Sequence, residues 1–348
     1  MLEIILALVV LYALVITILW LRSLSNAQSA DLSLKAAFKK RQAMMNATIE
    51  AKADEAMQLH QTFQKFVPRQ FVEHFAKSGT HSLELGRADE DKVTVLFCDL
   101  RGFTSLSEQM LPQELMHFLN SYFLRMNAPI HHNNGFIDKF IGDAIMALFD
   151  SPQGEDHDKA ADAVNAALEI QTALRLYNSH RANSHYPAVR NGIGIHFGPV
   201  VLGTIGSDDR MDTTVIGDTV NVAQRIESLC PYFNADILAS ESTLLLAGKK
   251  VDVVYRLLDN IRFKGKSVSV PVVEVLSHLS EEIKAQKLLA ANAILEGIKL
   301  RENGAFEDAL KHFESCKVSF TDDLAIDHHI SFCQRALDDK HWDGHVQL

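Results

Sequence analysis

Two aspartates stand where strand-like segments of the chain end. Asp99 closes the run 92–99, whose valines and phenylalanine alternate with other mostly apolar residues as in a buried strand. Asp143 lies in the two-residue break between the strand-like runs 136–141 and 144–149, where a hairpin tip is expected. Carboxylates are the ligands that Mg²⁺ prefers beside substrate phosphates. The pair could therefore hold a divalent cation, the alternative being two ordinary turn residues.

A second polar group lies in the segment 213–225. Asp218 is expected to cap a helix that starts at Thr219. Asn221 and Arg225 are four residues apart and would share one face of that helix. A planar guanidinium and an amide that project together suit a phosphate whose charge grows during a reaction. The alternative is an exposed polar face with no chemical role.

The elements around these motifs alternate in an order that brings the two aspartates together. After the strand that ends at Asp99, the apolar spacing predicts a helix over 115–126 and, beyond the hairpin, a helix over 156–178. A strand over 190–197 with a hairpin partner at 200–204 completes the set. Strand, helix, two strands, helix, strand is the split βαβ order, in which the first strand lies beside the hairpin. The sequence predicts an α+β, ferredoxin-like domain.

Composition narrows the class of protein. The chain has 348 residues, 47% of them hydrophobic, which is enough for a full core and two or three domains. Its net charge of −10 argues against a nucleic-acid binder, which would carry a basic face. The four cysteines show no paired or zinc-binding spacing, as expected in a reducing compartment.

The chain divides into four parts. An apolar run predicts one transmembrane helix at 3–22, and because basic residues follow it, the remainder is expected in the cytoplasm at the inner membrane. A cleaved signal peptide is the less favoured alternative. A helical connector over 23–79 and a globular domain over 80–278 are expected to follow. The segment 279–348 is expected to be all helical.

The C-terminal segment resembles one tetratricopeptide-type helical hairpin, with a further helix over 327–336. One such unit cannot bury its own core, so it should pack on the catalytic domain or on a protein partner. The histidine pairs 131–132 and 328–329 have no partner at metal-ligand spacing, and exposed helix ends are expected for both.

Three motifs carry a resemblance to a known family. The segments VTVLFCDLRGFT (93–104), FIDKFIGD (136–143) and RMDTTVIGDTVNVAQR (210–225) are similar, in order and spacing, to those of the class III nucleotidyl cyclases. The resemblance spans about residues 66–276. It implies a cyclase domain in which metal ions assist the attack of the ribose 3′-hydroxyl on the α-phosphorus, with loss of pyrophosphate.

The resemblance also implies site residues. Asp99, Asp143 and the backbone carbonyl of Leu100 would hold two Mg²⁺ or Mn²⁺ ions, Asn221 would orient the ribose, and Arg225 would stabilise the transition state. The resemblance further implies that Lys139 and Thr214 bind the base. Lys264 and Arg210 would contact the phosphates, with Lys266 as an alternative to Lys264.

The base-binding pair favours ATP over GTP. Lys139 stands where guanine-specific members carry Glu, and a lysine would donate to adenine N1 but face the protonated N1 of guanine. The Lys and Thr pairing resembles a bacterial subgroup that includes bicarbonate-responsive enzymes. Thr213 departs from the family, whose bacterial members often have an aromatic residue at that position.

In this family the metal-binding and base-binding residues of one site come from opposite subunits. Because this chain holds both sets, a head-to-tail homodimer with two equivalent sites is expected. A membrane-anchored adenylate cyclase is thus the leading hypothesis. A guanylate cyclase, a catalytically silent homologue with a regulatory role, and a membrane-tethered interaction protein are the alternatives.

Overall fold

The computed structural model describes residues 1–63, 88–151, 153–207, 209–266 and 268–339. It separates into two units, residues 1–67 and 68–348, each treated by itself below. The last part of the predicted connector, residues 64–79, lies outside the described residues.

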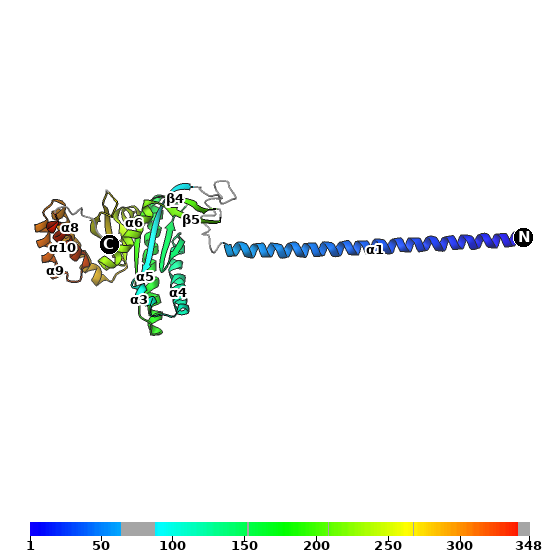
Figure 1. The fold of residues 1–348 in the computed structure, drawn as a ribbon, viewed down its shortest axis with the longest axis horizontal. Coiled ribbons are helices and arrows are strands. Elements are labelled where there is room, and N and C mark those ends of the chain that lie inside the picture. Colours follow the sequence, from blue (N-terminus) through cyan, green and yellow to red (C-terminus); the bar gives the residue numbers. More distant parts are fainter. Residues whose placement is uncertain (64–87, 152, 208, 267, 340–348) are drawn as a thin grey trace. The chain divides into compact units, whose positions relative to one another are not determined.

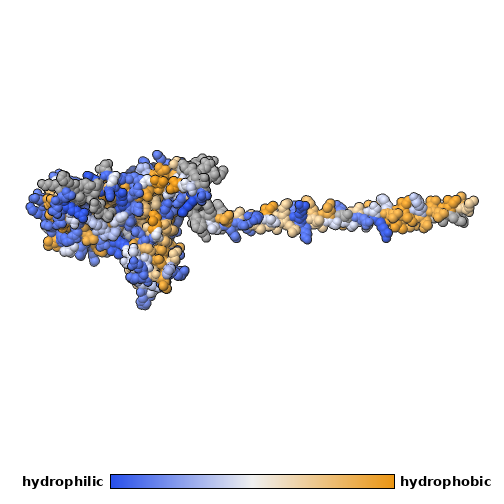
Figure 2. Space-filling model, viewed as in Figure 1, coloured by the Kyte–Doolittle hydropathy of each residue, from blue (hydrophilic) through white to orange (hydrophobic). Residues whose placement is uncertain are grey.

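The first unit contains one long helix, α1 (Leu2–Phe63). It includes the predicted membrane span and most of the connector without a break. Large apolar side chains of its first part are exposed (Figure 2). The hydroxyl of Thr17, a polar residue inside the apolar run, donates to the carbonyl of Ala13 at 2.6 Å, which satisfies it within the helix as a lipid environment requires. Helix α1 is long and apolar enough to cross a membrane, by length and composition alone.

The second unit is built on an eight-stranded sheet (Figure 1). Seven strands follow the order β2-β3-β1-β4-β6-β8-β7, and β5 pairs with β4. The strands are β1 (Ala88–Leu100), β2 (Phe136–Ile141), β3 (Ala144–Phe149), β4 (Asn191–Ser207), β5 (Arg210–Ile216), β6 (Ile237–Ser240), β7 (Tyr255–Ile261) and β8 (Val270–Val275). The helices are α3 (Phe103–Ser107), α4 (Pro112–His132), α5 (Asp156–Asn183), α6 (Asp218–Phe233), α7 (Glu241–Ala247), α8 (Glu281–Glu302), α9 (Phe306–Ser319) and α10 (Leu324–Asp338).

The central strands have the predicted split βαβ arrangement. Strand β1 lies between β3 and β4 and is antiparallel to both, so the first strand does sit beside the β2–β3 hairpin. Because successive strand residues point to opposite faces, Leu96 and Cys98 enter a core with α4 and α5, while Val95 and Phe97 enter a second core on the other face.

One strand differs from the prediction. The expected turn between 197 and 200 does not exist, because β4 runs unbroken from Asn191 to Ser207 and pairs with β1 along that length, with Lys92 opposite Pro199. Its hairpin partner is β5, which pairs Val201 with Ile216 and Ser207 with Arg210. Gly198 and Pro199 look like a turn in the sequence but fit an extended strand here.

The C-terminal helices pack on the domain that is built on the sheet, one of the two arrangements predicted for them. Helices α8, α9 and α10 share a core with α6 and the β6–β8–β7 end of the sheet (Figure 1). Buried residues from both sides form that core, among them Leu229, Phe233, Leu258, Ile294, Phe313 and Ile326.

Candidate active site

Asp99 and Asp143 meet at one end of the sheet. Asp99 is the penultimate residue of β1, and Asp143 lies in the turn between β2 and β3, where Gly142 takes the left-handed conformation (φ 64°). Strand β3 pairs with β1, Ile145 standing opposite Cys98, so the turn ends beside Asp99. The two carboxyl groups are joined by a hydrogen bond.

The environment of this pair favours a proton or a cation. Burial, the charge of Asp143 and the hydrogen bond between the two side chains raise the pKa of Asp99 to about 7. The backbone N–H of Leu100 donates to Asp99 Oδ1 at 3.1 Å and opposes that rise. Two like charges in a half-buried position repel unless something positive lies between them. The donor set therefore fits a hard divalent cation.

Glu227 is a third acid that the sequence did not single out. Glu227 lies on α6, close to Gly192 of β4: a Cβ added to Gly192 would be 3.0 Å from Glu227 Oε1. Because Gly192 pairs with Asp99 across the β1–β4 ladder, Glu227 lies near the carboxylate pair. Burial, followed by the charge of Asp99, raises the pKa of Glu227 to about 8. The available signal was a glutamate between the buried Ile226 and Cys230, on the face of α6 that covers the sheet.

Lys139 and Thr214 form a second polar group. The amino group of Lys139, on β2, donates to the hydroxyl of Thr214, on β5, at 2.9 Å. Asp138 is at a bulge of β2, with its carboxylate fully buried and 3.4 Å from the Lys139 amino nitrogen. Burial raises the pKa of Asp138 to about 6 despite that lysine. A donor and an acceptor thus lie side by side where the sequence placed the base-binding residues.

A third group lies at the start of α6. Asn221 is exposed, and Nη1 of Arg225 donates to the backbone carbonyl of Lys264 at 2.7 Å. The side chain of Lys264 is exposed, and that of Arg210 is exposed at the start of β5. Asp218 does not cap the helix as predicted, because α6 begins at Asp218 itself and its carboxylate pairs with Lys266.

Within one chain these three groups are not linked by direct polar contacts. Among the residues that the structure describes, no hydrogen bond or ion pair joins the Asp99–Asp143 pair to the Lys139–Thr214 pair or to Arg225.

Comparison with known proteins gives the family. The model of the adenylate and guanylate cyclase catalytic domain matches residues 86–276, more than half of the chain. The chain belongs to this family. The resemblance on which the sequence analysis relied is thereby confirmed, and so is the cyclase fold.

Two curated relatives are adenylate cyclases. The adenylate cyclase of Anabaena cylindrica is 40% identical over 236 residues, which cover 66% of this chain and 46% of the relative. The terminal-differentiation specific adenylate cyclase of Dictyostelium discoideum is 36% identical over 259 residues, 74% of this chain and 12% of the relative. The chain thus spans less than half the length of either relative. A bacterial light-regulated adenylyl cyclase structure covers 70% of this chain and 67% of its own at 24% identity and a TM-score of 0.58, a likeness in fold alone.

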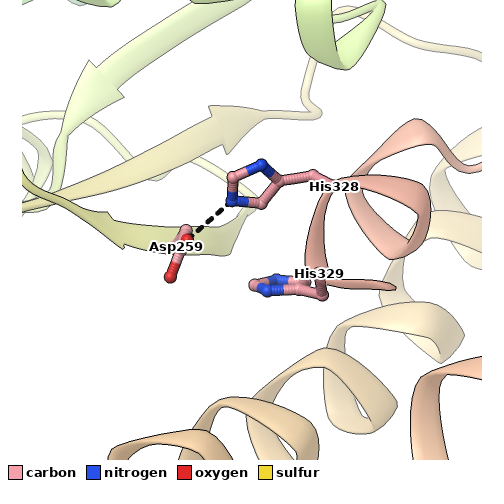
Figure 3. Close-up of side chains that lie close together, drawn as sticks. All are labelled: Asp259, His328 and His329. Carbon is pink, nitrogen blue, oxygen red and sulfur yellow. Dashed lines mark hydrogen bonds and ion pairs between the residues drawn. The ribbon is translucent and has the colours of Figure 1, made fainter. Parts of the chain in front are cut away.

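The cyclase unit holds one more cluster of possible metal ligands, and it corrects a prediction. His328 and His329 are not exposed helix ends: both are buried on α10, facing Asp259 of β7 (Figure 3). His328 Nε2 donates to Asp259 at 2.7 Å, and His329 Nε2 donates to the carbonyl of Leu258 at 2.9 Å. The guanidinium of Arg301 bonds both oxygens of Asp259.

The contacts of this second cluster indicate a role in holding helices to the sheet rather than in binding a metal. Arg301 also donates to His329 Nδ1 at 3.0 Å, so a cation would have to displace a guanidinium from the same carboxylate. Burial lowers the pKa of His329 to about 3, which keeps it neutral as this acceptor role requires. Although burial opposes it, the hydrogen bond from His328 and the surrounding positive charges hold the pKa of Asp259 well below its usual range. The cluster ties α8 and α10 to β7 of the cyclase domain.

Proposed function

We propose that this protein is an adenylate cyclase that converts ATP into 3′,5′-cyclic AMP and pyrophosphate. The observation that carries the proposal is the convergence of Asp99 and Asp143, by a fold of the cyclase family, into one carboxylate pair. The names of the relatives from Anabaena and Dictyostelium support the choice of adenylate cyclase.

The carboxylate pair would hold the divalent metal. Asp99 and Asp143, with the carbonyl of Leu100, are the donors, and Mg²⁺ or Mn²⁺ fits them as a hard cation. Bound there, two such ions lower the pKa of the ribose 3′-hydroxyl and neutralise the triphosphate. Burial and then the charge of Asp143 raise the pKa of Asp99, and a bound cation would offset both by stabilising the ionised form.

The helix α6 would supply the transition-state contacts. Among the described residues, Arg225 donates through Nη1 to the carbonyl of Lys264, and its other N–H groups would reach a phosphoryl oxygen. A permanent positive charge at the α-phosphorus stabilises the charge that grows as the 3′-oxygen attacks. Asn221, four residues before it, would orient the ribose, and Lys264 and Arg210 would contact the phosphates.

The Lys139–Thr214 pair would select adenine. The Lys139 amino group can donate to adenine N1, and the Thr214 hydroxyl can accept from the exocyclic amino group. Their 2.9 Å separation in this structure keeps the two side chains oriented toward each other before a base arrives. Guanine would present a donor at N1 to the lysine, leaving a buried donor without an acceptor.

The active unit would be a homodimer. In the family to which this chain belongs, the metal-binding and base-binding residues of one site come from opposite subunits, so a second copy would bring Lys139 and Arg225 to the carboxylate pair. Apolar side chains lie exposed on β2, β4 and β5 of the cyclase domain: Phe140, Ile141, Ile205, Met211 and Ile216. Exposed apolar groups of this kind mark protein interfaces.

The anchor would be α1. Its exposed apolar first part and the basic residues after it support a single membrane span with the cyclase domain in the cytoplasm. The activating signal would then arrive through the membrane, through the C-terminal helices or through a small molecule such as bicarbonate.

The test is a product assay on the purified full chain in detergent. With ATP and Mn²⁺ we expect cyclic AMP, with GTP at most a few per cent of that rate, and with Asp143→Asn neither product. Cyclic GMP as the main product would replace the proposal with a guanylate cyclase. No product from either nucleotide, with a folded dimer verified by light scattering, would favour the silent homologue.

A further inference from the structure

A cavity of about 540 Å³ lies away from the proposed catalytic residues. It is lined by α3, α4, the C-terminal half of α5 and the segment 184–187 that follows α5. None of the metal, base or phosphate residues proposed above lines it. Its volume lies in the range of sites that hold small organic molecules.

The guanidinium of Arg181 is a buried cation in the lining of this cavity. The side chain is only 7% exposed, and its central carbon lies 5.0 Å from the ring of Phe118, 5.6 Å from that of Tyr177 and 5.5 Å from that of Tyr186. Nε donates to the carbonyl of Pro187 at 2.8 Å. Nη2 is buried and has no acceptor among the described residues. A buried donor without a partner is costly and calls for an acceptor.

A second guanidinium, Arg125, shares the cavity. Its central carbon lies 4.8 Å from the ring of Tyr177, and its Nη1 donates to the carbonyl and hydroxyl of Ser121 at 2.7 and 2.8 Å. Among the described residues neither Arg125 nor Arg181 has a carboxylate within ion-pair distance. Glu114 is the one acid among the described lining residues, and it already accepts from the backbone N–H of Leu111 at 3.0 Å.

The charge of this cavity is therefore opposite to that of the molecule. Two permanent cations face one engaged carboxylate in a chain whose net charge is −10. Guanidinium groups that stack on aromatic rings keep their edge N–H groups free, and that edge matches the oxygens of a carboxylate or phosphate. Apolar side chains such as Leu106 and Met110 complete the wall.

We propose that this cavity binds a small organic anion, with an oxyanion head on the two arginines and an apolar body against the rings. A small molecule fits better than a protein surface because the main anchor, Arg181, is nine-tenths buried and only a ligand that enters the cavity can reach it. The head group is a carboxylate or a phosphate monoester, and the experiment distinguishes the two.

The test uses benzoate and phenyl phosphate as probes on the full chain in detergent, by isothermal titration at constant ionic strength. Benzyl alcohol is the uncharged control. We expect one molecule of one or both anions per chain with a Kd of about 1 mM, as is usual for ligands of this size. Arg181→Met and Arg125→Met should each weaken binding about tenfold or more, the loss typical of a charge-assisted hydrogen bond.

The matched control is Arg175→Met, on the same helix as Arg181. Arg175 bonds the carbonyl of His278 and the hydroxyl of Thr172, and it does not line the cavity. This variant should bind the probes as the unaltered chain does. If Arg181→Met does not fold, as judged by circular dichroism, Arg125→Met decides the matter, because Arg125 is less buried.

Tighter binding of benzoate would assign a carboxylate ligand, and tighter binding of phenyl phosphate a phosphorylated one. Three results would overturn the proposal: no heat from either anion at about 10 mM, equal binding of benzyl alcohol, or unchanged affinity in both arginine variants. Cyclase activity is not the readout, so the outcome does not depend on the proposed reaction.

Discussion

The protonation state of Asp99 should control how tightly the carboxylate pair binds a metal ion. With its pKa raised to about 7 by burial and by Asp143, Asp99 is mostly protonated at pH 6 and mostly ionised at pH 8 when no cation is bound. A divalent ion needs the ionised form and competes with that proton. The affinity for metal should therefore rise as the pH rises through 7.

We expect the Kd of Mn²⁺ for the full chain, measured by electron paramagnetic resonance, to fall about tenfold between pH 6 and pH 8. Asp99→Asn should bind Mn²⁺ weakly at both pH values and lose this dependence. Equal Mn²⁺ affinity at pH 6 and 8 in the unaltered chain would show that Asp99 is not the competing group.

Base selection is a second residue-scale property. In Lys139→Glu the donor facing adenine N1 becomes an acceptor, which suits the N1–H of guanine and repels adenine N1. We expect kcat/KM for ATP to fall at least about tenfold and the ratio of GTP to ATP turnover to rise. Thr214→Val, which removes only the hydroxyl beside it, should lower ATP turnover without favouring GTP. A variant Lys139→Glu that keeps its preference for ATP would place base recognition elsewhere.

At the scale of elements, the contact between α8 and α9 has no room for a side chain. A Cβ on Gly297 would lie 2.1 Å from the ring of Phe313, which is fully buried. Alanine in a helix interior normally stabilises it by about 0.5–1 kcal/mol relative to glycine. Here the added methyl group must displace the ring, at a cost of about 1–3 kcal/mol.

We therefore expect Gly297→Ala to lower the free energy of unfolding of the cyclase unit in a urea titration. Gly248→Ala is the matched control, because the nearest atom to its Cβ would be the Leu244 carbonyl oxygen at 3.4 Å, an ordinary contact. If both variants were equally stable, α8 and α9 would not pack as described.

The sequence predicted the elements whose signals are local. The alternation that ends at Asp99 and the helical spacing after residue 115 have periods of two and 3.6, and β1 and α4 formed there. The sequence-based prediction was wrong where the conformation of a segment depends on pairing with a segment far along the chain. Gly198 and Pro199 look like a turn, but the length of β1 keeps β4 extended across them. Short strands such as β6 depend on neighbours for their existence.

The site shows the same division. Asp99, Asp143 and the Lys139–Thr214 pair were singled out from motifs, because each lies in a recognisable segment, and their roles stay predictions. Glu227 and the His328–His329 cluster were not, because their burial arises from packing of α6 and α10 against strands encoded far away. A histidine pair in a sequence carries no sign of whether a buried aspartate such as Asp259 will face it.

At the scale of the whole molecule, each chain carries every residue of the proposed site. No direct polar contact among the described residues joins the carboxylate pair to the Lys139–Thr214 pair or to Arg225, and the proposal is that two copies share each site. In each proposed site, one copy supplies the metal-binding carboxylates, and the other supplies the base-binding and transition-state residues. A homodimer then holds two equivalent sites.

Coexpression of Asp99→Ala with Arg225→Ala tests this claim most directly, by the rate of cyclic AMP formation from ATP in the purified mixture. Each variant alone should be inactive, since both sites of its dimer lack one essential group. In an equal mixture half of the dimers combine the two variants, and each of these holds one intact site, so about a quarter of the unaltered activity should return. A mixture no more active than either variant alone, with mixed dimers verified by two affinity tags, would contradict the account.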